Sequence, residues 1–331
     1  PPDALGDKAQ VVVEVPVASD ALRGVLPSVE AMDRFRAANG SAWRFTVDAR
    51  RGVPSLLGGG ALPIIPGAAN DLPWEQMGAC RETRCIPVAA VEGRIRDLLG
   101  RWPEIFPVPA DELTVDPDGS GPFGASTYLL RLQWSPNGVP VDGGSIYVRI
   151  SGGNLIQIAT ETVSPAALDP SPAVDRGAAV DAVRSYLGPF ASPSDRWFDK
   201  GTLRFVPLTP AGQDPDELTA PPGEGIEYRL VWRLGFERPG VVGRWEALVD
   251  TQTGELLRFV DANRYGRVHG GAYPRDDHSG EADRPFPFVD IGAGQYADSG
   301  GLFPGDTATV TLNGRYTRID DACGPINATT T

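Results

Sequence analysis

The sequence predicts an α+β fold in which two units, each a helix packed on an antiparallel sheet, are followed by a small all-β module. Three observations predict this arrangement. Apolar residues recur at helical spacing in two stretches, near residues 88–102 and 174–187. Each stretch is followed by segments in which apolar and polar residues alternate, as in strands with one buried face. After residue 263 the helical spacing disappears, and short β runs remain between glycine and aspartate turns.

Residues 1–86 are predicted to be strand and loop that lead into the first unit. Trp43, Phe45 and Val47 alternate with polar residues, which predicts a strand over 43–48. The chain is then expected to turn. The glycine run at 58–60, with the prolines that follow it, predicts a loop.

Residues 87–164 form the first predicted unit. Its helix follows Pro87, with apolar residues three or four positions apart, and stops before Pro103 because proline disfavours helical backbone in the residue preceding it. A hairpin signal at Pro136, Asn137 and Gly138 separates the first two strands. The predicted strands are 128–134, 146–150 and 155–158.

Residues 165–172 are proline-rich and polar, which predicts a linker to the second unit at 173–262. Its helix is expected to line one face with Val174, Ala178, Ala182 and Leu187, and Gly188 ends it. The predicted strands are 203–207, 228–236, 245–249 and 256–260. Residues 263–331 are predicted to be a small β-sandwich-like module, or the start of a mature region, with strands at 286–291 and 307–312.

The composition excludes several classes of function. There are 43 acidic and 30 basic residues and no basic block, so at a net charge of −13 neither a nucleic acid nor an anionic membrane is an expected partner. No apolar stretch approaches the ~18 residues of a membrane-spanning helix. Three cysteines, two methionines and few lysines are typical of a secreted bacterial protein. The sequence begins with Pro1 rather than Met, so we expect that a targeting segment has been removed. Separately, we expect the chain to be a monomer.

The three cysteines predict one local disulfide. Cys80 and Cys85 lie close together in a polar segment before the first helix, and in an exported protein such a pair is expected to be oxidised. Cys323 is then left over. It is expected either to pair with a cysteine in a domain outside this sequence or to be a free buried thiol.

No catalytic residue, metal site or cofactor is expected in this chain. His269 and His278, with Asp276 and Asp277, are close enough in sequence to bind a divalent ion weakly, but a solvated loop explains them better. The acidic pairs elsewhere in the chain allow the two carboxylates of a glycosidase, yet solvated side chains explain them better as well. No His-Glu-x-x-His motif occurs.

Residues 134–141, 143–150 and 153–156 contain a strand, the turn Asn-Gly-Val-Pro-Val, a second strand and a glycine turn into a third. In this order they resemble the fungalysin/thermolysin propeptide domain, and residues 43–54 look like the region that precedes it in secreted zinc metalloproteases. The second unit resembles a PepSY domain in its helix and in the run Ala-Leu-Val-Asp-Thr-Gln-Thr-Gly-Glu-Leu-Leu at 247–257. Both units are therefore expected to be cystatin-like. Residues 266–270, 298–303 and 312–319 resemble, less closely, a carboxypeptidase regulatory-like β module.

The resemblance implies the propeptide of a secreted zinc metalloendopeptidase, which acts as an intramolecular chaperone and inhibitor. The catalytic domain, with its zinc and calcium, would follow Thr331 and be the partner. The expected cleft-blocking or cleavage segment is 261–273, and cleavage is expected either near 262–275 or after 331. The alternative is a stand-alone secreted binding module or trans-acting protease inhibitor. The candidate residues of the blocking segment are Asp261, Asn263, Arg264, Tyr265, His269 and Tyr273.

Overall fold

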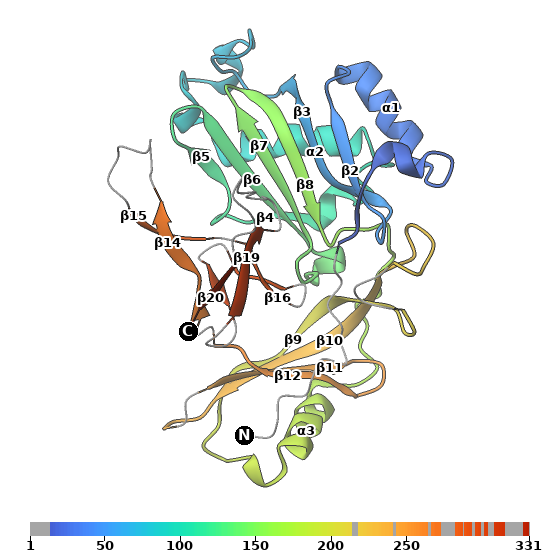
Figure 1. Cartoon of the computed structure of the whole chain (residues 1–331), viewed down its shortest axis with the longest axis vertical. Helices are drawn as coiled ribbons and strands as arrows, with labels where there is room; N and C mark the ends of the chain where they lie inside the picture. The colour runs from blue at the N-terminus through green and yellow to red at the C-terminus, as the bar shows by residue number, and fades with distance from the viewer. Residues whose placement is uncertain are drawn as a thin grey trace.

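The structure is a computed structural model, and its described residues form an α+β fold with three α-helices and several antiparallel sheets (Figure 1). Among these residues no helix is long and apolar enough to span a bilayer. The described residues are 14–213, 218–240, 243–263, 266–272, 282–286, 288–292, 295–298, 301–303, 308–314 and 327–330.

The first sheet contains eight strands in the order β1-β2-β3-β8-β7-β6-β4, with β5 paired to β6. Because β3 pairs with β8, the segment predicted to precede the first unit supplies strands to the same sheet as residues 127–161. The strands are β1 (Pro16–Ala18), β2 (Arg44–Asp48), β3 (Val53–Pro63), β4 (Leu113–Val115), β5 (Gly121–Phe123), β6 (Thr127–Trp134), β7 (Ser145–Ser151) and β8 (Asn154–Glu161).

Two helices, α1 (Ser28–Asn39) and α2 (Val88–Gly100), pack into one core with this sheet. α2 lies where the sequence predicts a helix. α1 lies where only strand and loop were predicted, and that prediction is wrong. Its buried residues, each 0% exposed, are Val29, Ala31, Met32 and Phe35. Val29, Met32 and Phe35 are three positions apart, so they form one buried stripe of an otherwise polar segment.

The loop predicted at residues 58–60 is also wrong, because β3 continues through these glycines to Pro63. A Cβ atom built on Gly60 would lie 2.2 Å from the ring of Trp43. Trp43 itself is 1% exposed and is part of the core. Glycine is therefore needed here so that an indole can lie flat against the strand, not to break the strand.

The second sheet has the order β12-β11-β10-β9, and α3 (Arg176–Leu187) covers one of its faces. Asp175 caps the helix by accepting the N–H of Ala178. The buried helix residues are Ala179, Val183 and Leu187, so the face predicted through Ala178 and Ala182 is one position out of register. The strands are β9 (Arg196–Leu208), β10 (Glu227–Glu237), β11 (Arg244–Asp250) and β12 (Leu256–Asp261).

The remaining described residues form short strands around a small core of Val268, Val289, Ala297, Phe303 and Val310. They are β13 (Gly266–Arg267), β14 (His269–Ala272), β15 (Ala282–Pro285), β16 (Val289–Gly292), β17 (Gln295–Tyr296), β18 (Leu302–Phe303), β19 (Ala308–Gly314) and β20 (Asn327–Thr330). Single-turn 3-10 helices occur at η1 (Ser19–Leu22), η2 (Trp74–Met77), η3 (Thr83–Cys85), η4 (Ala110–Glu112), η5 (Pro136–Gly138) and η6 (Gly188–Phe190).

Candidate interaction site

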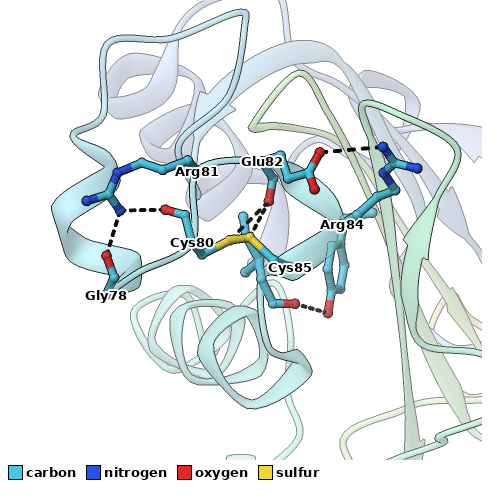
Figure 2. The surroundings of a disulfide bond; sticks show 8 residues. Gly78, Cys80, Arg81, Glu82, Arg84 and Cys85 are labelled. Atoms are coloured by element: carbon cyan, nitrogen blue, oxygen red, sulfur yellow. Dashed lines mark hydrogen bonds and ion pairs between the residues drawn. A yellow bond between two sulfur atoms is a disulfide. The ribbon is translucent and has the colours of Figure 1, made fainter.

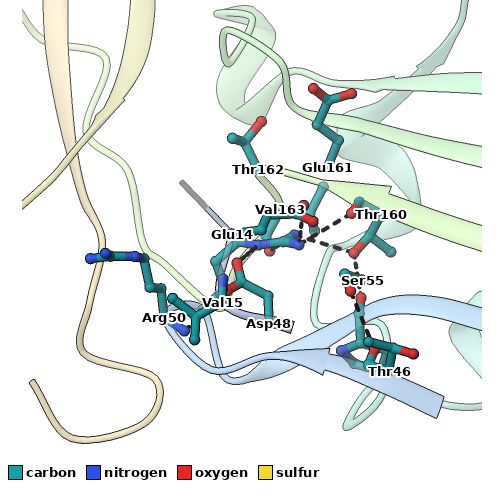
Figure 3. A network of polar contacts seen from close by, with 12 residues as sticks. Glu14, Val15, Thr46, Asp48, Arg50, Ser55, Thr160, Glu161, Thr162 and Val163 are labelled. Atoms are coloured by element: carbon teal, nitrogen blue, oxygen red, sulfur yellow. Dashed lines mark hydrogen bonds and ion pairs between the residues drawn. The ribbon is translucent and has the colours of Figure 1, made fainter. Parts of the chain in front are cut away.

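The turn after β2, at residues 48–52, is buried and holds two arginines that sequence reasoning treated only as part of a turn. Arg51 is 1% exposed, and its Nε donates to Asp48 Oδ2 at 2.5 Å. Its terminal nitrogens donate to the carbonyl oxygens of Thr160 and Val163, both at 3.2 Å, and to Glu14 at 3.0 Å. Figure 3 shows its partners Glu14, Asp48, Thr160 and Val163 close together. One guanidinium thus joins β2, the end of β8 and the N-terminal segment.

The carboxylate of Asp48 completes this network. It is 0% exposed and accepts the backbone N–H of Val15 at 3.0 Å and of Arg50 at 3.1 Å, besides the Arg51 side chain. A buried carboxylate is tolerated only when such donors replace water. The pair is therefore a fixed part of the core rather than a free acid or base.

The second unit docks on the same turn through backbone contacts. The N–H of Gly223 donates to the carbonyl of Ala49 at 2.8 Å, and that of Gly225 to the carbonyl of Arg50 at 2.9 Å. A Cβ atom on Gly52 would lie 2.9 Å from the Cα of Gly223. The loop between β9 and β10 therefore lies directly against the turn.

Side chains extend this joint between the two units. Tyr228 packs edge-on against Trp134, with ring centroids 5.6 Å apart, and its hydroxyl donates to the carbonyl of Thr162 at 2.8 Å. Burial raises the pKa of Tyr228 to about 12. Phe205 and Leu230 belong to the core of the first unit as well. The joint, which we define as residues 48–52 with these contacts, makes the two sheets share one core across the predicted linker.

The predicted blocking segment begins at the end of β12. Asp261 Oδ1 accepts the N–H of Arg244 and of Asn263, both at 3.0 Å, so the chain leaves the second sheet anchored to the start of β11. Arg264, Tyr265 and Tyr273 lie outside the described residues.

The next part of that segment, residues 266–272, is paired with other strands. β13 pairs with β18, and β14 pairs with β15. Gly266 leaves room for Phe303, since a Cβ atom there would lie 2.1 Å from its ring. His269 is exposed, and its Nδ1 lies 2.7 Å from Asp283 Oδ1. His278, Asp276 and Asp277 lie outside the described residues. Within the described residues, no three histidine, cysteine or acidic side chains are close enough together to hold a metal ion.

Cys80 and Cys85 are joined by a disulfide, in the place where the sequence predicts one (Figure 2). The carbonyl oxygen of Glu82 lies 3.0 Å and 3.1 Å from the two sulfur atoms, and Arg81 donates to the carbonyls of Gly78 and Cys80. The disulfide closes the loop immediately before α2. Cys323 lies outside the described residues.

Comparisons with known proteins identify a distant structural neighbour. No protein-family model and no curated protein matches the chain. Among solved structures, the C-terminal domain of YpeB from Bacillus megaterium is similar over 67% of this chain and 77% of that chain, at 10% sequence identity and a TM-score of 0.28. The function is therefore argued from the residues of this chain.

Proposed function

We propose that this chain is the non-catalytic propeptide of a secreted zinc metalloendopeptidase. In this proposal the first unit corresponds to a fungalysin/thermolysin propeptide domain and the second to a PepSY domain, both cystatin-like. The partner is a catalytic domain that follows residue 331 and holds the zinc and the calcium. The chain assists the folding of that domain and inhibits it as a monomer until cleavage.

The observation that carries the proposal is the joint. A propeptide inhibits best when the part that contacts the enzyme is ordered in advance, because ordering it on binding costs affinity. Here the two sheets share a core and the chain leaves β12 from a fixed point at Asp261. Covalent attachment then raises the effective concentration of the inhibitor, so that weak contacts are sufficient.

The pairing of residues 266–272 sharpens the proposed mode of inhibition. Among the described residues β14 and β15 pair only with each other. Within the described residues, each of these strands therefore has one unpaired edge. Many proteases bind a substrate as a strand added to an exposed strand edge of the enzyme. In the proposal the β14–β15 hairpin occupies the substrate cleft as a preformed strand pair, and cleavage on either side of it releases the enzyme.

The test is inhibition in trans. The full chain is mixed at micromolar concentration with the mature protease encoded in the same precursor, and peptide hydrolysis is followed. We expect hydrolysis to slow several-fold, and an unrelated serine protease serves as the control that is not slowed. Undiminished hydrolysis argues against the proposal. An open reading frame that continues without a His-Glu-x-x-His domain favours the alternative, a stand-alone secreted binding module or trans-acting inhibitor.

A further inference from the structure

The first sheet has one face that carries no helix of the described chain. Figure 1 shows α2 behind β6, β7 and β8, with the opposite face of these strands toward the viewer. Along β6, residues such as Tyr128 and Leu130 are buried toward α2, whereas the alternate residues Leu129 and Arg131 point to the other side. We call this second side the open face.

A row of cross-strand partners runs over the open face from β2 to β7. Arg44 is opposite Gly58, Gly58 is opposite Gln157, and Gln157 is opposite Arg149. Directly opposed residues of an antiparallel pair lie on the same side of the sheet. The row therefore places one arginine at each end, with a glycine and a glutamine between them.

The two arginines of this row differ from the third arginine on the open face. Arg131 forms an ion pair with Asp116 at 3.1 Å and lies over the ring of Tyr147. Arg44 and Arg149 are exposed, and within the described part of the chain neither side chain forms an ion pair. Two exposed arginines without an ion pair to any described residue are unusual on one face of a chain whose net charge is −13.

The surface between these arginines is hollow and partly apolar. A hollow of about 740 Å³ includes Arg44, and one of about 270 Å³ includes Arg149, with Gln157 lining both. Leu56, which is 38% exposed, lines the first hollow, and Leu129 lines the second. The two hollows adjoin at Gln157, and Phe288 of the C-terminal module also lines the second. We call the two hollows together the groove.

We propose that this groove binds an extended acidic segment of a partner polypeptide. Three interstrand spacings of ~4.8 Å separate Arg44 from Arg149, which is roughly 14–15 Å. An extended chain rises ~3.4 Å per residue, so side chains four residues apart are about 13.6 Å apart and lie on the same side. The partner segment carries two carboxylates at this spacing, one for each guanidinium, with apolar side chains beside Leu56 and Leu129. Arginine suits this role because its donors match a carboxylate in a bidentate pair.

The proposal concerns the open face alone and does not depend on the propeptide role. It is tested with the full chain and a fluorescein-labelled nine-residue peptide of valine and threonine, with glutamates at its third and seventh positions. Fluorescence anisotropy measures the dissociation constant. We expect R44Q and R149Q each to weaken binding about threefold, and the double variant about tenfold, in the range of exposed charge pairs. The matched control, R101Q with R196Q, removes two exposed arginines elsewhere and should leave binding unchanged.

A second variant tests the groove without changing its charge. A Cβ atom on Gly58 would lie 3.6 Å from the carbonyl oxygen of Ile156, an ordinary contact, so G58V fits the strand while it fills the hollow. We expect G58V to weaken binding about tenfold with unchanged thermal stability. The proposal is overturned if no saturable binding occurs up to about 1 mM, or if the control variant weakens binding as much as the double variant. Equal binding of a peptide with adjacent glutamates, or of a short single-stranded DNA, would also overturn it.

Discussion

Each of the two larger sheets contains a buried tryptophan that is followed by Val-Asp and then by a glycine at the same spacing. The residues are Trp43, Val47, Asp48 and Gly52 in the first sheet and Trp245, Val249, Asp250 and Gly254 in the second. The two glycines have positive φ angles of 70° and 75°. Their N–H groups donate to the carbonyls of Asp48 and Asp250 at 2.8 Å and 2.9 Å. The chain thus forms the same turn twice.

The two turns differ in the cation that balances the aspartate. Asp48 is paired with Arg51 of its own turn, and both side chains are 1% exposed or less. Asp250 is paired at 3.0 Å with Arg229 of the neighbouring strand, whose side chain is 37% exposed. The first turn lies within the joint between the units and the second reaches solvent. The same local backbone turn can therefore be a buried contact between two units or a turn at the protein surface. What differs is whether the arginine that pairs with its aspartate is buried or exposed.

The largest expected difference between the turns is in the unfolding free energy lost when the aspartate is replaced by alanine. D48A leaves the buried guanidinium of Arg51 with only the partly exposed carboxylate of Glu14, and losing its buried partner costs about 3–5 kcal/mol of unfolding free energy. D250A removes the acceptor for the N–H groups of Gln252 and Thr253, but Arg229 can turn toward water, so the cost is about 1–2 kcal/mol. Urea unfolding of the two variants measures the difference.

Should D48A not fold, D48N separates the loss of charge from the loss of shape. The amide oxygen can still accept the N–H groups of Val15 and Arg50, so D48N should be folded and still less stable than D250N. Equal losses in the two turns would contradict the interpretation that burial of the cation distinguishes them.

The glycines provide the second comparison. G52A and G254A both force a left-handed backbone on alanine, which costs about 1 kcal/mol. A Cβ atom on Gly52 also lies 2.9 Å from the Cα of Gly223, whereas the nearest atom to one on Gly254 is 3.7 Å away, in Val174. We therefore expect G52A to cost about 2–3 kcal/mol in total and G254A about 1 kcal/mol. Thermal unfolding measures both losses. A smaller loss for G52A than expected would show that the backbone around Gly52 and Gly223 shifts easily to make room for the added Cβ atom.

Local sequence patterns predicted most strands of both sheets, because alternation is a local property of a strand with one buried face. They missed α1, where four buried residues lie among charged ones: Val29, Ala31, Met32 and Phe35. They also misassigned the glycines of β3. Gly60 is in a strand because Trp43, distant in sequence, packs on it, and local pattern cannot show this.

The joint was not predictable in the same way. Its contacts join residues far apart in the chain, such as Arg51 with Val163 and Ala49 with Gly223. Two adjacent arginines in a turn are ordinarily solvated. Arg51 is buried by residues of the first sheet that lie far away in the sequence, and Arg50 lies against Gly225 of the second unit. The repeated Trp-x-x-x-Val-Asp-x-x-x-Gly spacing was the available signal that both turns have the same backbone.

The third comparison uses alkaline pH, since the charged groups of the first turn, Asp48 and Arg51, are the ones that act on Tyr228. Burial raises the pKa of this phenol to about 12, above the ordinary value of 10.0. The folded protein therefore keeps the phenol neutral where the unfolded chain ionises. Its contribution to stability is fully present below about pH 10 and is lost as pH rises to about 12, by about 2 kcal/mol. Y228F should flatten this fall in unfolding experiments, with Y186F on α3 as the control, and an unchanged fall in Y228F would contradict the assignment.

The smallest expected effect is at the cation of the second turn. R229Q removes a partly exposed partner of Asp250, whose carboxylate keeps two backbone N–H donors, so we expect a loss of about 1 kcal/mol. Because salt screens exposed pairs, the difference between wild type and R229Q should shrink by about half at 1 M NaCl. The corresponding variant R51Q, in a pair closed to solvent, should lose more and show little dependence on salt. A strong salt dependence of the stability lost in R51Q would mean that water reaches the Asp48–Arg51 pair. Burial of the cation would then not distinguish the two turns.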